Sequence, residues 1–205
     1  LGHYDQALHD LDGDSNTEAH SIGGIVGKAL QFDGLDDWIN CGAHPADDAL
    51  TTGHDFTIAF WWKSPTQAVD ANIFGAMGPD YDARIMVLPR SAGSVRLQVI
   101  LAGRNLGCYV GGADDGSWHH YLVRRDRETL SWFHDGLEVF SNTAPENQGS
   151  LAGGSMVIGA RYDEYGPAPG ACDDFRLYGR ALSDGEIQAL YDQGSGSGSA
   201  ARYVQ

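Results

Sequence analysis

The sequence predicts an all-β fold in which short antiparallel strands form a two-sheet sandwich. Apolar and polar residues alternate with a period of two through most of the 205-residue chain. Clusters of Gly, Asp, Asn or Pro interrupt this pattern at intervals of about 8–15 residues. No stretch has the strand–helix–strand spacing of a parallel sheet. The length is ordinary for one large sandwich domain, and we therefore expect a single hydrophobic core.

The alternation predicts eleven strands in chain order. They cover Lys28–Phe32, Trp38–Cys41, Phe56–Lys63, Asn72–Ala76, Arg84–Leu88, Val95–Leu101, Trp118–Arg125, Leu130–Phe133, Leu137–Ser141, Ser155–Ala160 and Asp173–Tyr178. Trp61 and Trp62 are adjacent in one strand, so they must point to opposite faces, and at most one of them can serve as a binding platform. His119 and His120 also fall on opposite faces, and we expect structural roles for both.

One hairpin and one helix have clear local signals. Asp135-Gly136 separates two strand-like runs and is typical of a tight two-residue turn. Ser183 and Glu186 have the spacing of a capping box, which predicts a helix from this point to a stop at Gly194. We therefore assign residues 1–193 to the domain and residues 194–205, which begin with alternating Gly and Ser, to a linker and C-terminal tail.

The charge of the chain disfavours some partners. The net charge is −15, which repels nucleic acid. Of the acidic residues 22 are Asp and six are Glu, which suits turns and calcium ligation but is also typical of an acidic surface from a saline habitat. The longest apolar run, Phe56–Trp62, is too short to span a membrane. The three cysteines match no metal cluster, and we expect them to be small buried residues.

The order of several motifs resembles the laminin G-like jelly-roll domains of the concanavalin A-like lectin/glucanase superfamily. The motifs are Gly27–Gly34 followed by Asp37-Trp38-Ile39, Phe56–Lys63, Trp118–Val123, Leu130–Gly136 and the closing run Asp173–Ser183 with Glu186-Ile187. Together they cover about residues 10–193. The resemblance implies two curved antiparallel sheets, usually without catalytic activity, that often bind carbohydrate or protein and often carry calcium.

A calcium site is one expectation. The segment Asp10–Asn16 gathers side-chain oxygens around a turn glycine, as a calcium loop does. The resemblance implies that this loop, the turn after the first long strand and the acidic pair before the last strand share one structural ion. Its ligands are then Asp12, Asp14, Asp33 and Asp173. The alternative is that Asp10–Asn16 is an Asx-rich turn without an ion.

A ligand surface is the second expectation, and it rests on two loops that mix aromatic, acidic and basic residues. From Gly78–Arg84 and Arg161–Pro167 we single out Tyr81, Arg84, Tyr162 and Tyr165, because rings stack on sugar faces while Arg binds hydroxyls. Arg104, Asn105 and Tyr109 would extend such a surface. A protein-binding patch has a similar composition, so both alternatives stay open.

We do not expect an enzyme, because the six glutamates never form the paired arrangement that glycoside hydrolases of this fold need. Two functional hypotheses remain. The first is a lectin-like domain that binds a glycan or a surface protein, at an extracellular location or on a particle surface. The second is a structural or adhesion component of an assembly, such as a virion decoration or surface-fibre protein, whose C-terminal tail contacts other subunits.

Overall fold

A computed structural model describes the chain over residues 21–43, 50, 53–65, 71–78, 83–90, 93–101, 103–151 and 154–196, together with the backbone of residues 7–9. The side chains of residues 43 and 148 are not included. Within these ranges no helix is long and apolar enough to cross a membrane.

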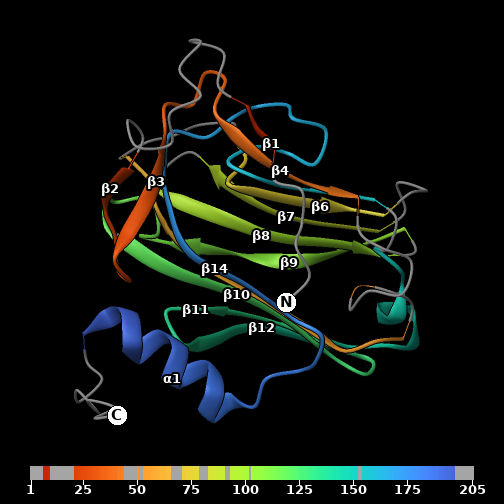
Figure 1. Cartoon of the computed structure of the whole chain (residues 1–205). Helices are drawn as coiled ribbons and strands as arrows, with labels where there is room; N and C mark the ends of the chain where they lie inside the picture. Colours follow the sequence, from red (N-terminus) through yellow and green to blue (C-terminus); the bar gives the residue numbers. More distant parts are fainter. Residues whose placement is uncertain are drawn as a thin grey trace.

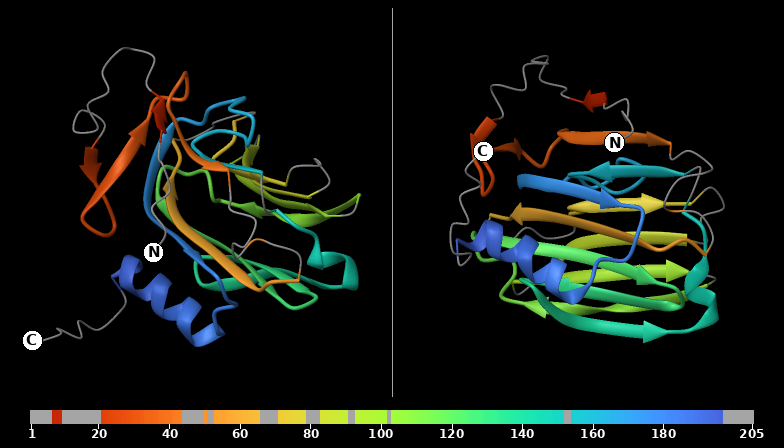
Figure 2. Two further views of the ribbon diagram at one scale, coloured as in Figure 1. Left: turned by 45° about the vertical axis from the view of Figure 1, so that its right-hand side comes forward. Right: turned by 60° about the horizontal axis from the view of Figure 1, so that its bottom comes forward.

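The described strands form two seven-stranded sheets that pack face to face (Figures 1 and 2). The order in the first sheet is β1 (Ala7–His9), β4 (Trp38–Ala43), β13 (Ser155–Ile158), β6 (Phe74–Met77), β7 (Ala83–Arg90), β8 (Ser94–Leu101), β9 (Arg104–Gly111). In the second it is β12 (Leu137–Thr143), β11 (Thr129–His134), β10 (Trp118–Asp126), β5 (Phe56–Lys63), β14 (Gly170–Tyr178), β3 (Lys28–Phe32), β2 (Ser21–Gly23). Neighbouring strands pair antiparallel throughout, for example β7 with β8 and β5 with β10. The predicted all-β jelly-roll sandwich is confirmed.

The expected strands are found, with shifted bounds and three additions. The additions are β1, β2 and β9. Strand β9 was missed because Gly107 and Gly111 lie within it, and glycine is depleted in strands. The predicted strand at Asn72 begins later, at Phe74, because Asn72 instead forms an isolated parallel bridge with Pro167.

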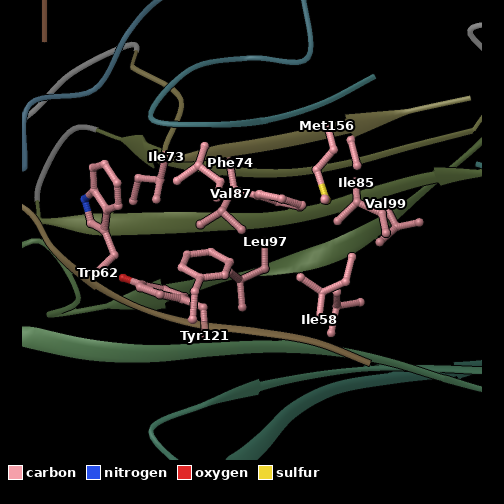
Figure 3. Close-up of a cluster of buried hydrophobic side chains, with 14 of the residues drawn as sticks. Ile58, Trp62, Ile73, Phe74, Ile85, Val87, Leu97, Val99, Tyr121 and Met156 are labelled. Carbon is pink, nitrogen blue, oxygen red and sulfur yellow. The ribbon is translucent and has the colours of Figure 1, made fainter. Parts of the chain in front are cut away.

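The core lies between the two sheets and is built from the inward-facing half of each strand. Figure 3 shows Ile85, Val87, Leu97 and Val99 of the first sheet meeting side chains of the second, among them Trp62. Each of these side chains is buried. Because every second residue of β7 and β8 is used in this way, the intervening residues must face outward.

The hairpin between β11 and β12 turns at Asp135 and Gly136, as predicted. Both residues have positive φ, 50° and 78°, as a type I′ turn requires. The Asp135 carboxylate accepts the amide of His120 at 2.8 Å, which ties the turn to the neighbouring strand β10.

The helix α1 (Asp184–Ser195) begins at the predicted capping box, where the Ser183 side chain and Glu186 satisfy each other's backbone amides. The prediction that it ends at Gly194 was wrong, because the left-handed cap is Gly196, with φ of 70°. Gly194 lies inside the helix at its closest approach to the sheet, where an added Cβ would lie 2.3 Å from the Trp61 ring. The remaining predicted tail, residues 197–205, lies outside the described ranges.

The helix lies across part of the outer face of the second sheet (Figure 2), over β5, β10 and β11. Ile187 is fully buried against Ala59, Leu122 and Phe133. Trp61 points outward and stacks on Tyr191 of the helix with ring centroids 5.7 Å apart, while Trp62 points into the core. The two tryptophans do face opposite ways, and the outward one is covered by the helix. It therefore offers no open binding platform.

Replacing Ile187 by Ala should lower the free energy of unfolding by about 2–5 kcal/mol, because it removes the side chain that anchors the helix in the sheet. Chemical denaturation measures this directly. The matched control is Gln188→Ala on the exposed side of the same helical turn, which should change stability by about 0.5 kcal/mol or less. Equal effects of the two substitutions would contradict the docked position of the helix.

Candidate functional site

The outer face of the first sheet carries polar and aromatic side chains at alternate positions of three neighbouring strands. The register aligns Leu88 of β7 with Arg96 of β8, and Arg96 with Tyr109 of β9. Two outward rows along, Arg84 lies opposite Ile100, and Ile100 lies opposite Asn105. These rows of outward residues form the first candidate surface.

A shallow hollow of about 210 Å³ lies on this face between β8 and β9. Gly107, which has a φ of 145°, is among the residues that line it. A Cβ at this position would collide with the backbone carbonyl of Leu97. The glycine that hid β9 in the sequence is therefore required by the close approach of β8.

The rim of the hollow is held in place by hydrogen bonds. The Asn105 Oδ1 atom accepts the Gln98 Nε2 amide at 2.8 Å and an Arg96 guanidinium N–H at 3.3 Å. The Arg96 guanidinium carbon lies 5.7 Å from the centroid of the Tyr109 ring, and 64% of Tyr109 is exposed. The hollow thus combines an open aromatic face with amide and guanidinium groups.

The segment Arg161–Gly166 lies across the same outer face, over β6 and β7. Gly75 makes this possible, because a Cβ there would lie 2.4 Å from the backbone nitrogen of Tyr162. The Ser155 hydroxyl donates to the Tyr162 carbonyl at 2.7 Å, and the Asn40 amide donates to the Glu164 carboxylate at 2.8 Å. The loop is therefore seated on the sheet by packing and by hydrogen bonds.

Tyr162 anchors this loop and is not the exposed stacking residue that we expected. Only 8% of it is exposed, because its ring packs on Met86 and Leu88. Its hydroxyl accepts a hydrogen bond from Arg84 at 3.1 Å. The expectation of an exposed ring was wrong because the sequence does not show that this loop lies across β7, where Met86 and Leu88 cover the ring.

Tyr165 is the open aromatic residue of the loop, with 67% of it exposed. The Arg161 guanidinium carbon lies 4.8 Å from the Tyr165 ring centroid and 5.5 Å from that of Tyr162. Arg161 also binds Asp163 through two hydrogen bonds of 2.6 Å, and these lower the pKa of the Asp163 carboxyl. The guanidinium is thereby fixed beside the Tyr165 ring.

The structure brings together three of the four residues singled out as ligand contacts. Arg84 touches Tyr162, and Arg161 connects Tyr162 with Tyr165. Tyr81 lies outside the described residues. Arg104 pairs instead with Glu146 at 3.3 Å.

Sequence reasoning missed Arg96 and Gln98, although their alternation with Val95, Leu97 and Val99 already places them on the outer face.

Asp33, one of the expected calcium ligands, lies in the turn after β3. Its Oδ1 atom accepts the amide of Leu35 at 2.7 Å, and its own amide donates to the Asp37 carboxylate at 2.7 Å. Three carboxylate oxygens, one from each of Asp33, Asp36 and Asp37, lie within 4.8 Å of one another. Such a group of oxygens fits a hard cation.

Asp173 lies at the other end of the same strand pair. Its carboxylate is buried and accepts the amides of Val26 and Asp174, each at 2.7 Å. Cys172 pairs with Leu30, so Asp173 falls beside Ala29, four residues before Asp33 and therefore about 13 Å from it along the strand. The structure does not bring Asp33 and Asp173 together, and Asp12 and Asp14 lie outside the described residues.

Several solved structures share this fold. Domain 4 of AbnA, a GH43 extracellular arabinanase from Geobacillus stearothermophilus determined with arabinotriose, is similar with a TM-score of 0.65, 21% identity and coverage of 83% of this chain and 80% of that one. The Ruminococcus gnavus IT-sialidase CBM40 has a TM-score of 0.58 at 14% identity, over 80% of this chain and 96% of the other. The receptor binding domain of botulinum neurotoxin C/D mosaic serotype has a TM-score of 0.67 at 12% identity. That match covers 92% of this chain and 46% of the toxin domain.

The search of curated protein sequences gave no match. The sequence pattern of one family matches residues 33–188, which is more than half of the chain and includes both sheets and the start of the helix. The expected resemblance is confirmed, and the chain belongs to the concanavalin A-like lectin/glucanases superfamily.

Proposed function

We propose that this protein is a non-catalytic, lectin-like domain that binds carbohydrate on the outer face of the first sheet. The observation that carries the proposal is the hollow over Gly107, where the exposed Tyr109 ring lies beside the hydrogen-bonded groups of Arg96 and Asn105. The Tyr165 ring and Arg84 extend the surface over β7, and Tyr81 belongs to the same proposal from sequence alone.

The chemistry of the hollow suits a sugar. A pyranose or furanose ring presents C–H groups that stack on an aromatic face, while its hydroxyls need fixed donors and acceptors at the edge. Arg96 and Asn105 already hold each other in position, so binding costs little further side-chain entropy. Two open rings, Tyr109 and Tyr165, suit an oligosaccharide that contacts more than one point.

The comparisons support this class of ligand. The similar arabinanase domain was determined with arabinotriose, and the sialidase module is named as a carbohydrate-binding module. Both belong to enzymes that act on glycans, and the first is extracellular. We propose an extracellular or particle-surface location for this domain as well. Its net charge of −15 disfavours contact with nucleic acid.

The carboxylates beside the loop are engaged in structural contacts, which favours binding without catalysis. Asp163 is neutralised by two hydrogen bonds from Arg161, and Glu164 accepts the Asn40 amide. A glycosidase needs two carboxyl groups about 5–9.5 Å apart that face the substrate freely. The alternative of a packing unit in an assembly relied on the C-terminal tail, whose residues 197–205 lie outside the described ranges.

Replacing Tyr109 by Ala should weaken glycan binding by about tenfold or more, because it removes the open stacking face at the hollow. A glycan array identifies the ligand, and isothermal titration with the best glycan then measures the affinity. The melting temperature should stay nearly constant, since the side chain is mostly exposed. Leu137→Ala, an equally exposed change on the second sheet, is the control and should bind normally. Absence of glycan binding in the unmodified protein would refute the proposal.

Tyr162 and Tyr165 should respond differently to the same substitution. Tyr165→Ala should reduce glycan affinity with little change in melting temperature, because its ring is exposed. Tyr162→Ala should lower the free energy of unfolding by about 3 kcal/mol, because it empties a packed position. Thermal denaturation and titration of both variants separate the anchor from the contact residue. If Tyr162→Ala is as stable as the unmodified protein, the described seating of the loop is wrong.

The proposal includes a structural calcium ion in the turn after β3, with Asp33 and the Asp10–Asn16 segment, including Asp12 and Asp14, as its ligands. The carboxylate oxygens of Asp33, Asp36 and Asp37 support it, because an ion would offset their mutual repulsion. Asp173 is left out of this ligand set, because the strand register separates it from Asp33.

Calcium at about 100 times its dissociation constant should stabilise the fold by about 2.7 kcal/mol, which is about 5–10 °C in melting temperature for a domain of this size. Calorimetry in calcium and in EGTA tests this. Asp33→Asn should abolish the difference between the two conditions. Asp173→Asn should lower the melting temperature equally in both, since it weakens an acceptor of two backbone amides. An identical melting temperature with and without calcium leaves the Asx-turn alternative.

A further inference from the structure

A second cluster of possible metal ligands lies far from the turn after β3, at the open end of the β10–β11 pair, where β11 turns into β12. His119 is the second residue of β10, His134 is the last residue of β11, and Asp135 opens the turn that follows. Tyr121 pairs directly with His134, so His119 and His134 lie on the same face of the sheet. One ligand atom from each of His119, His134 and Asp135 lies within 4.8 Å of the others.

The atoms converge on one carboxylate oxygen. Asp135 Oδ2 lies 2.8 Å from His119 Nδ1 and 3.6 Å from His134 Nδ1. The two imidazole rings are stacked, with centroids 5.0 Å apart and planes inclined by 23°. Ligand atoms around a tetrahedral zinc ion at 2.0–2.1 Å lie about 3.3 Å from one another. The two observed distances bracket that value.

A second carboxylate, that of Asp115, contacts the His119 ring on the side opposite Asp135. Asp115 Oδ1 lies 3.2 Å from His119 Nε2, the nitrogen that points away from Asp135. Histidines that bind metals donate their other N–H to a carboxylate or carbonyl, which fixes the ring and its tautomer. Asp135 is fixed similarly, because its Oδ1 atom accepts the His120 amide and leaves Oδ2 for the ion.

The cluster is largely shielded from water. Only 13% of the His119 side chain and 11% of the His134 side chain are exposed. The buried Nε2 atom of His134 has no hydrogen-bond partner among the described residues.

The charges of the cluster also suit a cation. Burial lowers the pKa of His134, which favours the neutral ring, and a neutral imidazole has one nitrogen with a free lone pair. The hydrogen bond to Asp135 raises the pKa of His119. Tyr121, the other titratable group packed against His134, stays neutral because burial raises its pKa well above the usual value. The two aspartates Asp115 and Asp135 leave the cluster negative.

We propose that His119 Nδ1, His134 Nδ1 and Asp135 Oδ2 form a binding site for a divalent transition-metal ion of the zinc type, with water as the fourth ligand. Mixed imidazole and carboxylate ligands select such ions, whereas calcium prefers oxygen alone. The ion joins the loop that carries Asp115, the start of β10 and the β11–β12 turn. Asp115 is a positioning residue for His119.

Titration of the untagged 205-residue chain with zinc chloride tests the proposal. The unmodified protein should bind one equivalent that calcium does not displace. His119→Gln and His134→Gln should each weaken this binding by about 100-fold or more, and Asp115→Asn by about 10–100-fold. His54→Gln is the matched control, because His54 is exposed and, among the described residues, its backbone carbonyl accepts a hydrogen bond from Arg125. It should bind zinc normally.

Cobalt(II) provides a second readout that a structural role of the histidines would not produce. In place of zinc it should give the visible absorption bands of a four-coordinate site with nitrogen and oxygen ligands. His119→Gln should abolish these bands, and Asp115→Asn should change them, because Asp115 orients the His119 ring.

Melting temperatures in EDTA show which variants fold. If His134→Gln does not fold, His119→Gln and the half-exposed Asp115→Asn decide the outcome. Zinc binding by His119→Gln at the affinity of the unmodified protein overturns the proposal, as does an equal loss in His54→Gln. Glycan binding is measured on a different face, so its result is independent of this one.

Discussion

The structure depends on one constraint. Each sheet must bury one of its two faces against the other sheet, and its second face stays on the outside of the sandwich. In both sheets the inward residues make one shared core, so four sheet faces reduce to two outer ones. The helix α1 packs on the outer face of the second sheet, where Ile187 and Tyr191 cover Ala59 and Trp61. The candidate ligand surface lies on the outer face of the first sheet, away from the helix.

Much of this architecture could be predicted from the sequence because the signals are local. The Asp135-Gly136 turn needs two residues with positive φ, and the capping box needs only Ser183 and Glu186. The helix end was misplaced because Gly194 is required by contact with Trp61, a residue far away in the chain. A glycine can mark a helix stop, a close approach or a hollow in a strand, and its sequence neighbours do not distinguish the three.

The candidate site could be predicted only in part, since it depends on which strands become neighbours. Arg84 and Tyr162 were selected from two separate loops and do meet, but the burial of Tyr162 depends on Met86 and Leu88 of β7. The separation of Asp33 and Asp173 likewise depends on the register of β3 with β14. Register and strand order arise from long-range pairing, which composition and periodicity do not specify.

Arginine–tyrosine pairs recur across the outer face of the first sheet and give it a common chemistry. The guanidinium of Arg96 lies over Tyr109, that of Arg84 over Tyr162 and that of Arg161 over Tyr165, with distances to the ring centroids of 5.7, 6.0 and 4.8 Å.

In a chain with only 13 basic residues and a net charge of −15, such a grouping differs from a general solvated surface. Each arginine occupies one side of a ring, which restricts the ring and points hydrogen-bond donors along its edge. Where the tyrosine is exposed, as Tyr109 and Tyr165 are, the other side of the ring stays open. An apolar face bordered by fixed donors is what a sugar ring and its hydroxyls require, and two such faces on one sheet favour a ligand with several sugar units.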